Sequence, residues 1–373
     1  MPKRGECIYK RKDGRWEARY IESYTNEGKA NYKSVYAPTY TEVKNKLKLY
    51  RESNTKRKST SSTGVGQLSI DWLKNKRIHI KQSTYANYYR LMHNHILPYF
   101  KNVSTKALSE EILNKFIEGK LVGGRLDNKD GGLSAKTIHD LWSLLAQIIK
   151  YGELKNYVSN FNYMVTLPKI KTSELLVLSQ IEQSKLVKYI KLNFDIEKLG
   201  VLLSLFMGVR LGEVCSLTWS DINFETKTVR INKTIQRIKN TEDNAATKTK
   251  IIIDTPKSEK SIREIPIPSF LLSLLKNYKG PFCTYILSGT TSYIEPRAYQ
   301  SRFKIYLKNA GIKDTKYHSL RHTFATRAIE HGFDIKALSE ILGHSSVKFT
   351  LERYVHPSHE FKKINIEKLA VCY

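Results

Sequence analysis

The chain has 373 residues, of which 63 are Lys or Arg and 35 are Asp or Glu, so its formal net charge is +28 at pH 7. Hydrophobic residues make up 40% and charged residues 26%, which is ordinary globular usage and excludes wholesale disorder. The longest apolar run, Leu199 to Val209, is about half of the ~20 residues that span a bilayer. We therefore expect no membrane segment, and no apolar stretch near the start indicates a signal peptide.

The charge excess predicts a polyanionic partner, and nucleic acid is the first candidate for a chain of this size. Residues 1–62 carry a net charge of +9, residues 63–170 carry +7 and residues 171–373 carry +12. Because all three segments are basic, we expect the whole chain to lie along a phosphate backbone. A basic protein without such a partner is the alternative. Four widely spaced cysteines form no secreted-type framework and favour a reduced cytoplasmic compartment.

Residues 6–36 have the pattern of a three-stranded antiparallel sheet with turns at Asp13-Gly14 and residues 26–28. Three apolar residues alternate along its middle strand and share one face: Trp16, Ala18 and Tyr20. Thr39 and Glu42 form a capping box that opens a helix behind the sheet. The polar stretch from Arg51 to Gly66 predicts a linker.

Residues 67–165 show helical periodicity and no convincing strand. Four amphipathic stretches begin near these apolar residues: Leu68, Tyr85, Ile112 and Ile138. A glycine-rich loop over residues 123–132 separates the last two stretches. This pattern predicts a helical bundle whose aromatic stripes lie in its core, followed by a second linker over residues 169–173.

Residues 174–373 mix helical and extended patterns. Ser179 and Glu182 cap one helix, and residues 196–207 form a nearly all-apolar, buried one. Residues 226–238 and 248–267 predict an extended hairpin, after which helices return. The expected fold is multidomain: a small three-stranded β-sheet plus helix in residues 1–62, an all-α bundle in residues 63–170, and a mixed α+β, mainly helical domain with a small β-sheet in residues 171–373.

Four short segments of the last domain hold the candidate catalytic residues. Arg210 follows the buried helix, with Glu213 one turn further on, and Lys257 lies at the predicted hairpin turn. His318 and Arg321 are further candidates, three residues apart at the start of a predicted helix. The last two are His344, which precedes a short predicted helix, and Tyr354, which that helix carries. Each motif alone is weak, because an Arg-x-x-Glu pair is usually structural and a His-x-x-Arg pair usually lies on a solvated face.

In this order and at these spacings, the four segments resemble the tyrosine recombinase (phage integrase) family over roughly residues 65–373. The resemblance implies that Tyr354 is the nucleophile and that Glu213 supports Arg210. It further implies a catalytic set around the tyrosine: Arg210, Lys257, His318, Arg321 and His344. Lys260 is a rival for the role of the lysine.

These residue types suit the cleavage and rejoining of DNA without ATP. A covalent phosphotyrosine stores the energy of the broken phosphodiester, and two arginines can hold the non-bridging oxygens of the transition state. His318 and His344 can add hydrogen bonds, with His318 able to accept the Tyr354 proton, and Lys257 can protonate the leaving 5′-oxygen. We expect no cofactor and no metal, since the histidines and cysteines show no zinc spacing.

The N-terminal segment resembles, more loosely, the arm-binding domain of integrases from temperate phages and conjugative transposons. In such domains a three-stranded sheet is expected to enter the major groove. The candidate DNA contacts in this segment are Lys10, Lys12, Arg15 and Arg19. A solvated sheet face is the alternative for them. In the bundle, Lys81 and Lys136 are the candidate contacts.

The resemblance implies a three-domain integrase that integrates and excises a mobile genetic element through a 3′-phosphotyrosyl intermediate and a Holliday junction. The expected partners are double-stranded DNA, at core and arm sites, and three further copies in a homotetramer at the bacterial nucleoid. An excisionase and a DNA-bending protein are candidate accessory partners. The apolar tail after Tyr354 would dock on a neighbouring protomer or on its own domain. A type IB topoisomerase-like enzyme and a non-enzymatic DNA-binding regulator are the alternatives.

Overall fold

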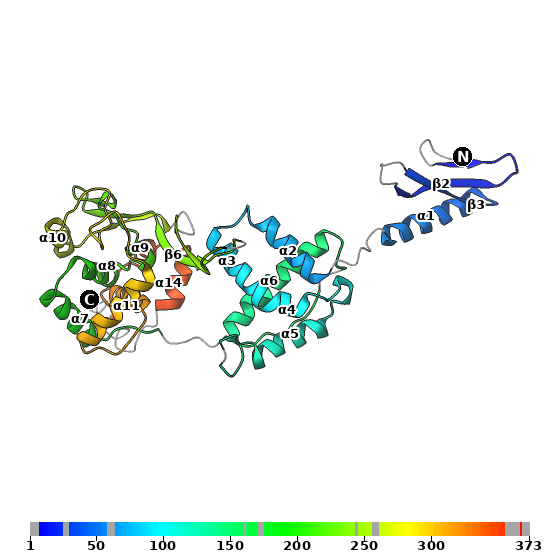
Figure 1. The fold of residues 1–373 in the computed structure, drawn as a ribbon. Coiled ribbons are helices and arrows are strands. Elements are labelled where there is room, and N and C mark those ends of the chain that lie inside the picture. The colour runs from blue at the N-terminus through cyan, green and yellow to red at the C-terminus, as the bar shows by residue number, and fades with distance from the viewer. Residues whose placement is uncertain are drawn as a thin grey trace. The chain divides into compact units, whose positions relative to one another are not determined.

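The computed structural model describes residues 7–24, 30–57, 64–127, 129–159, 162–170, 175–242, 245–255, 261–354 and 366–367. The chain divides into two compact units, Met1–Lys171 and Thr172–Tyr373. The first unit contains a small sheet with one helix and a helical bundle, and the second is mixed but mainly helical (Figure 1). No helix in the described part of the chain is long and apolar enough to cross a membrane.

The N-terminal part is an antiparallel sheet in the order β1-β2-β3, formed by Ile8–Lys10, Trp16–Tyr24 and Ala30–Ala37. Helix α1, Tyr40–Arg57, packs against one face, and the Thr39 hydroxyl caps it by accepting a hydrogen bond from the Glu42 amide at 3.3 Å (Figure 1). The core between sheet and helix consists of Ile8, Ala18, Ala37, Val43 and Leu47. The predicted sheet-plus-helix architecture is confirmed.

The predicted linker over residues 51–66 was wrong at both ends. Helix α1 continues to Arg57, because Lys, Arg and Glu side chains in this stretch are good helix formers despite their polarity. Helix α2, Val65–Lys76, already includes Gly66, where a Cβ would lie 2.9 Å from the Lys101 Cα. The glycine that indicated a linker is therefore required for close backbone packing.

The bundle is all-α, as predicted. Its helices are α2, α3 (Gln82–Leu91), α4 (Leu97–Phe100), α5 (Glu110–Gly123) and α6 (Ala135–Leu154). A π-helical turn, Met92–Ile96, continues α3 into α4, an extension that the sequence pattern did not predict. Aromatic residues such as Trp72, Phe100 and Phe116 are buried in the core, as expected for core rather than base-stacking positions.

The second unit is built around the buried helix α8, Leu199–Met207. Helix α7, Gln180–Leu192, precedes it and begins with the predicted capping box of Ser179 and Glu182. The remaining helices follow in chain order: α9 (Leu211–Val214), α10 (Ser269–Asn277), α11 (Pro296–Asn309), α12 (His318–Glu330), α13 (Ile335–Leu342) and α14 (Val347–Tyr354).

The predicted single hairpin is in fact two small sheets. Strands β4 (Ile222–Asn223), β5 (Thr228–Ile231) and β8 (Arg263–Pro266) form one, and β6 (Thr234–Lys239) pairs with β7 (Thr249–Asp254) in the other. The chain breaks at Lys233, whose ammonium lies 2.9 Å from Asp221 Oδ2. Val229, Ile231 and Ile235 keep the spacing of one strand face on both sides of Lys233, so the sequence pattern was interpreted as one continuous strand.

Candidate active site

Arg210 lies at the junction of two helices. Helix α8 ends at Gly208, whose left-handed φ of 66° suits glycine, and Arg210 is the N-cap of α9. The Arg210 amide donates to Glu213 Oε2 at 3.0 Å, and its Nη1 donates to Glu213 Oε1 at 2.7 Å. Its Nη2 donates to the carbonyl oxygen of Gly343 at 3.2 Å, which links α9 to the end of α13.

Glu213 is a buried carboxylate, 2% exposed, that accepts hydrogen bonds from two arginines. The second is Arg263 in β8, whose Nη1 and Nη2 lie 3.2 and 2.9 Å from the two carboxylate oxygens. Burial alone would raise the pKa of Glu213, but the charges and hydrogen bonds of Arg263 and Arg210 outweigh it and lower the pKa to about 2. The carboxylate is therefore charged and holds both guanidinium groups.

Arg263 is a site residue that sequence reasoning missed. Its Nε donates to the Ile341 carbonyl at 2.5 Å and its Nη1 donates to the Ser261 carbonyl at 3.1 Å, so it joins β8 to α13. A signal was present in the sequence, since Arg263 occupies the same strand face as the buried Ile265. A charged residue at an inward-facing position indicates a buried partner.

Arg321 is almost fully buried, with 1% of its surface exposed. Its Nη1 donates to the Gly208 carbonyl at 2.7 Å and its Nη2 donates to the Leu342 carbonyl at 2.6 Å. Burial, followed by the charge of Arg210, lowers the pKa of Arg321 to about 9. The guanidinium therefore ties together the end of α8, helix α12 and the end of α13.

His344 follows α13 and faces Arg321. Its Nε2 lies 3.0 Å from Arg321 Nη2, and because a guanidinium can only donate, Nε2 accepts. The ring proton is then on Nδ1, which donates to the Thr350 hydroxyl at 2.8 Å. Partial burial, together with Arg321 and Arg210, lowers the pKa of His344 to about 3, so the ring is neutral at pH 7.

Tyr354 is the last residue of α14 and is buried, with 7% exposed. Its ring lies parallel to that of His344, with centroids 6.2 Å apart. Its neighbours are mainly apolar residues of α12 and α13: Ala325, Ala328, Leu338 and Leu342. The Tyr354 hydroxyl lies 2.9 Å from Nδ1 of His322. Burial raises the pKa of Tyr354, an effect that Arg321 opposes.

His318 and His322 lie one helical turn apart on α12, with ring centroids 4.5 Å apart. His318 is exposed, and loss of hydration followed by the charges of Arg321 and Arg210 lowers its pKa. Within the described residues, the Tyr354 hydroxyl is hydrogen-bonded to His322, whereas the sequence analysis considered only His318 as the acceptor of its proton. His322 was missed because its position directly after Arg321 gave no indication of which residue it meets 32 positions later.

Four of the predicted residues therefore converge with Glu213 on one region of the second unit: Arg210, Arg321, His344 and Tyr354. His318 lies beside them at the start of α12. Lys257 and its rival Lys260 fall outside the described residues. The region gathers guanidinium groups and neutral imidazoles next to a phenol, which suits attack by the phenol on a phosphodiester.

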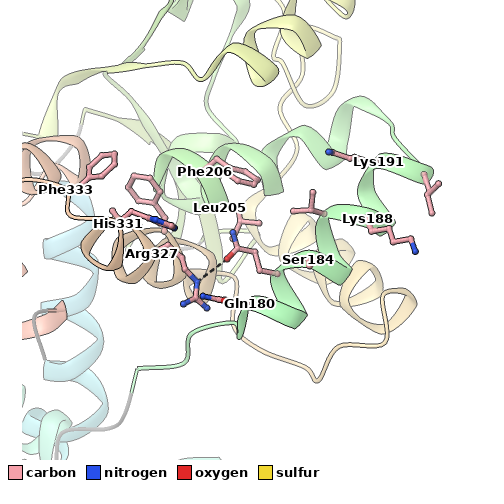
Figure 2. A pocket seen from close by; sticks show the side chains of 14 residues that line it. Gln180, Ser184, Lys188, Lys191, Leu205, Phe206, Arg327, His331 and Phe333 are labelled. Carbon is pink, nitrogen blue, oxygen red and sulfur yellow. Dashed lines mark hydrogen bonds between the residues drawn. The ribbon is translucent and has the colours of Figure 1, made fainter. Parts of the chain in front are cut away.

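A groove lies between α7, α8 and α12. The groove has a volume of about 990 Å³. Figure 2 shows the side chains that line it, among them the apolar Phe206 and Phe333 and the basic Lys188 and Lys191. None of the predicted catalytic residues lines the groove. The groove is therefore not the candidate reaction site, despite its volume.

The candidate DNA contacts of the N-terminal sheet differ in their surroundings. Lys12 and Arg15 are exposed near the first turn, and Arg15 lies 2.8 Å from Asp13. Arg19 is on the sheet face opposite α1. Lys10 is paired with Trp16 in the strand register and so shares the face that α1 covers, although it is exposed there.

Glu17 organises the open face of this sheet. The carboxylate is 3% exposed and accepts hydrogen bonds from Ser34 at 2.7 Å and from Tyr9 at 3.0 Å. It also pairs with Arg19 and with Arg11, which sequence reasoning did not select. The hydrogen bond from Ser34, with those from the other three, lowers the pKa of Glu17 to about 2.

The two candidate contacts in the bundle lie at the beginnings of helices. Lys81 is the N-cap residue of α3. Lys136 is exposed in the first turn of α6, with its ammonium 3.6 Å from Asp140 Oδ1. Neither lies in the bundle core.

Comparison with known proteins identifies the family. Residues 177–360 match the model of the phage integrase family, and residues 65–121 match a phage integrase N-terminal SAM-like domain. Tyrosine recombinase XerA of Pyrococcus furiosus is 33% identical over 230 residues, covering 59% of this chain and 69% of that protein. The chain belongs to the tyrosine recombinase (phage integrase) family. It is thus an enzyme that breaks and rejoins DNA, a site-specific recombinase.

Other relatives agree with this membership over nearly the whole chain. A XerC-like tyrosine recombinase of Caldanaerobacter subterraneus subsp. tengcongensis is 28% identical over 373 residues, covering 92% of each chain. The Tn1549 transposon integrase, solved with a circular intermediate DNA, has a TM-score of 0.65 at 21% identity, covering 82% of this chain and all of that one. A lambda integrase tetramer bound to a Holliday junction has a TM-score of 0.55 at 16% identity, covering 94% and 96%. These structures share the recombinase fold.

Proposed function

We propose that this recombinase integrates and excises a mobile genetic element, with Tyr354 as the nucleophile that forms a 3′-phosphotyrosyl intermediate. The observation that carries the proposal is the convergence of Arg210, Arg321 and His344 beside the Tyr354 ring. The phenol oxygen attacks the scissile phosphorus and the 5′-oxygen leaves. The phosphodiester energy is kept in the new ester, so that the reverse reaction rejoins a strand without ATP.

The roles of the surrounding side chains follow from their chemistry. Arg210 and Arg321 hold the non-bridging oxygens, where negative charge grows in the transition state. His344 and His318 add hydrogen bonds to the phosphate, and Lys257 protonates the leaving 5′-oxygen. Glu213 orients Arg210 through two hydrogen bonds and does not itself need to meet the substrate.

We assign residues 1–62 to arm-site binding, residues 63–170 to core-site binding and residues 171–373 to catalysis. In the arm domain, Lys12, Arg15 and Arg19 are the proposed contacts on the open side of the sheet, with Lys10 at its edge. Lys81 and Lys136 are the proposed contacts of the bundle. Phosphate contacts of this kind position the protein on the duplex rather than read its sequence.

We propose that four protomers act together on two core sites and exchange strands in two steps through a Holliday junction. This assembly matches the state in which lambda integrase was solved. The apolar tail after Tyr354 docks on a neighbouring protomer, and an excisionase and a DNA-bending protein set the direction of the reaction. The enzyme works on bacterial DNA at the nucleoid. The mobile-element assignment rests on the likeness to the Tn1549 transposon integrase.

The test uses suicide DNA substrates from the ends of the element, nicked near the cleavage position and incubated with chelator present. Wild-type protein should form a denaturant-resistant covalent adduct, and Tyr354→Phe should form none. Tyr306→Phe is the matched control, because Tyr306 is equally buried but lies in α11 away from the site. An adduct with Tyr354→Phe would remove Tyr354 as the nucleophile, and specific binding with no adduct from any variant would leave a DNA-binding regulator.

A further inference from the structure

Helix α12 places a second histidine against the tyrosine hydroxyl. His322 is four residues after His318 and directly follows Arg321, and its Nδ1 lies 2.9 Å from the Tyr354 oxygen. The His322 side chain is 8% exposed, so this contact is made out of bulk water. A hydrogen bond in such surroundings is electrostatically stronger than one at the surface.

The tautomer of His322 sets the direction of this hydrogen bond. The Arg321 guanidinium carries only donors, and its charge favours the deprotonated form of Tyr354. In the tautomer of His322 that carries its proton on Nε2, Nδ1 is an acceptor and the Tyr354 hydroxyl donates to it. A neutral His322 is consistent with its surroundings, since burial followed by His318, Arg353 and Arg321 lowers its pKa to about 4. A bound phosphate anion would favour the protonated ring and so strengthen it as a base.

We propose that His322 is a catalytic residue that holds the Tyr354 hydroxyl and takes its proton as the oxygen attacks the DNA phosphate. The inference rests on the proposed role of Tyr354 as the nucleophile. In this step the Tyr354 oxygen–phosphorus bond forms and the bond from phosphorus to the 5′-oxygen breaks. The phenol proton moves to His322 Nδ1, and the leaving oxygen receives a separate proton from the general acid, assigned above to Lys257. His318, exposed at the helix start, is left to contact the phosphate.

The first test is single-turnover cleavage of the suicide substrate by His322→Asn. The Asn amide oxygen can reach nearly the position of Nδ1 and keeps an acceptor there, but it cannot take up a proton. We expect cleavage about 100-fold slower than wild type, the usual size of a general base effect, with core-site binding unchanged. His331→Asn is the matched control, because it removes a histidine from the end of the same helix, away from Tyr354. It should cleave at the wild-type rate.

A second substrate separates proton removal from leaving-group protonation. When sulfur replaces the bridging 5′-oxygen, the leaving thiolate needs no proton. The defect of Lys257→Ala should then be largely rescued, whereas the defect of His322→Asn should persist. Rescue of His322→Asn by sulfur would overturn the inference, as would cleavage by this variant at or above the wild-type rate. Failure of wild-type protein to form any adduct would instead refute the proposed function on which the inference rests.

Discussion

Glu213 determines the position of two arginines although it lies behind the reacting groups. Its two oxygens accept four hydrogen bonds, two from Arg263 and two from Arg210. Arg263 in turn holds the backbone at Ile341, and Arg210 holds it at Gly343. Loss of this one carboxylate would therefore leave a buried guanidinium without its charge partner and release the chain segment that carries His344.

We expect Glu213→Gln to lower the free energy of unfolding by about 3 kcal/mol at pH 7, the equivalent of the pKa change from 4.5 to about 2. Because the folded pKa is the lower one, this stabilisation is complete above pH 4.5 and is lost as the pH falls through 2. The difference in the free energy of unfolding between wild type and Glu213→Gln should therefore become smaller as the pH falls from 4.5 to 2.

Urea unfolding at pH 7, 4 and 3 measures this difference. Glu225→Gln is the control, since Glu225 is an exposed carboxylate in a turn, and its effect should stay within about 0.5 kcal/mol. If the free energies of unfolding of wild type and Glu213→Gln differed by the same amount at all three pH values, the assignment of a charged, buried Glu213 would be contradicted.

Sequence reasoning located part of this site for physical reasons. Arg210 and Glu213 are one helical turn apart, and His318 and Arg321 are likewise, so local spacing was enough to pair them. Arg263 and His322 were not found, because their partners are 50 and 32 residues away. Only the packing of β8, α12 and α14 brings these side chains together, and no periodicity encodes it.

Among the helices, α8 is packed so closely that a glycine is required in its first turn. A Cβ at Gly200 would lie 2.5 Å from the Tyr299 hydroxyl and 2.7 Å from a Val214 methyl. The Gly200 carbonyl also accepts a hydrogen bond from the Tyr317 hydroxyl at 2.9 Å. Close packing at Gly200 thus supports the helix whose end positions Gly208 and Arg210.

We expect Gly200→Ala to destabilise the protein by about 1–3 kcal/mol, even though alanine is the better helix former, because the added methyl group overpacks the core. Gly119→Ala is the matched control. Gly119 lies within α5, is exposed, and has no atom within 4 Å of its would-be Cβ. Its replacement should stabilise by up to about 1 kcal/mol. Urea unfolding of both variants measures the change in the free energy of unfolding, which should be negative for Gly200→Ala and positive for Gly119→Ala. Stabilisation by Gly200→Ala would contradict the packing argument.

The larger elements were more predictable than their ends. Every amphipathic stretch of the bundle became a helix because its apolar face is continuous, as in Ile138 to Ile149 of α6. The end of α1 was missed because its last residues are polar. The division of residues 226–267 into two sheets was missed because Lys233 turns the chain through side-chain contacts with Asp221 and Thr218.

For the molecule as a whole, the charge distribution matches a recombinase that contacts DNA along its length. The net charge of +28 is shared among the three segments, so no single domain accounts for the attraction. The phosphate backbone supplies a sequence-independent part of the affinity, which decreases as salt increases. Specific recognition of attachment sites must then come from a smaller number of base contacts.

Tyr354 packs among residues of its own catalytic unit, and this has a consequence for mixed populations of subunits. If Tyr354 is the nucleophile, as proposed, it and the guanidinium groups beside it come from one polypeptide, so a subunit without Tyr354 and a subunit without Arg210 cannot complement each other. A mixture of Tyr354→Phe and Arg210→Ala should form no covalent adduct on suicide substrates, whatever the ratio. Either variant mixed with wild type should form adduct in proportion to the wild-type share. Adduct formation by the two-variant mixture would show that the tyrosine of one subunit acts in the active site of another.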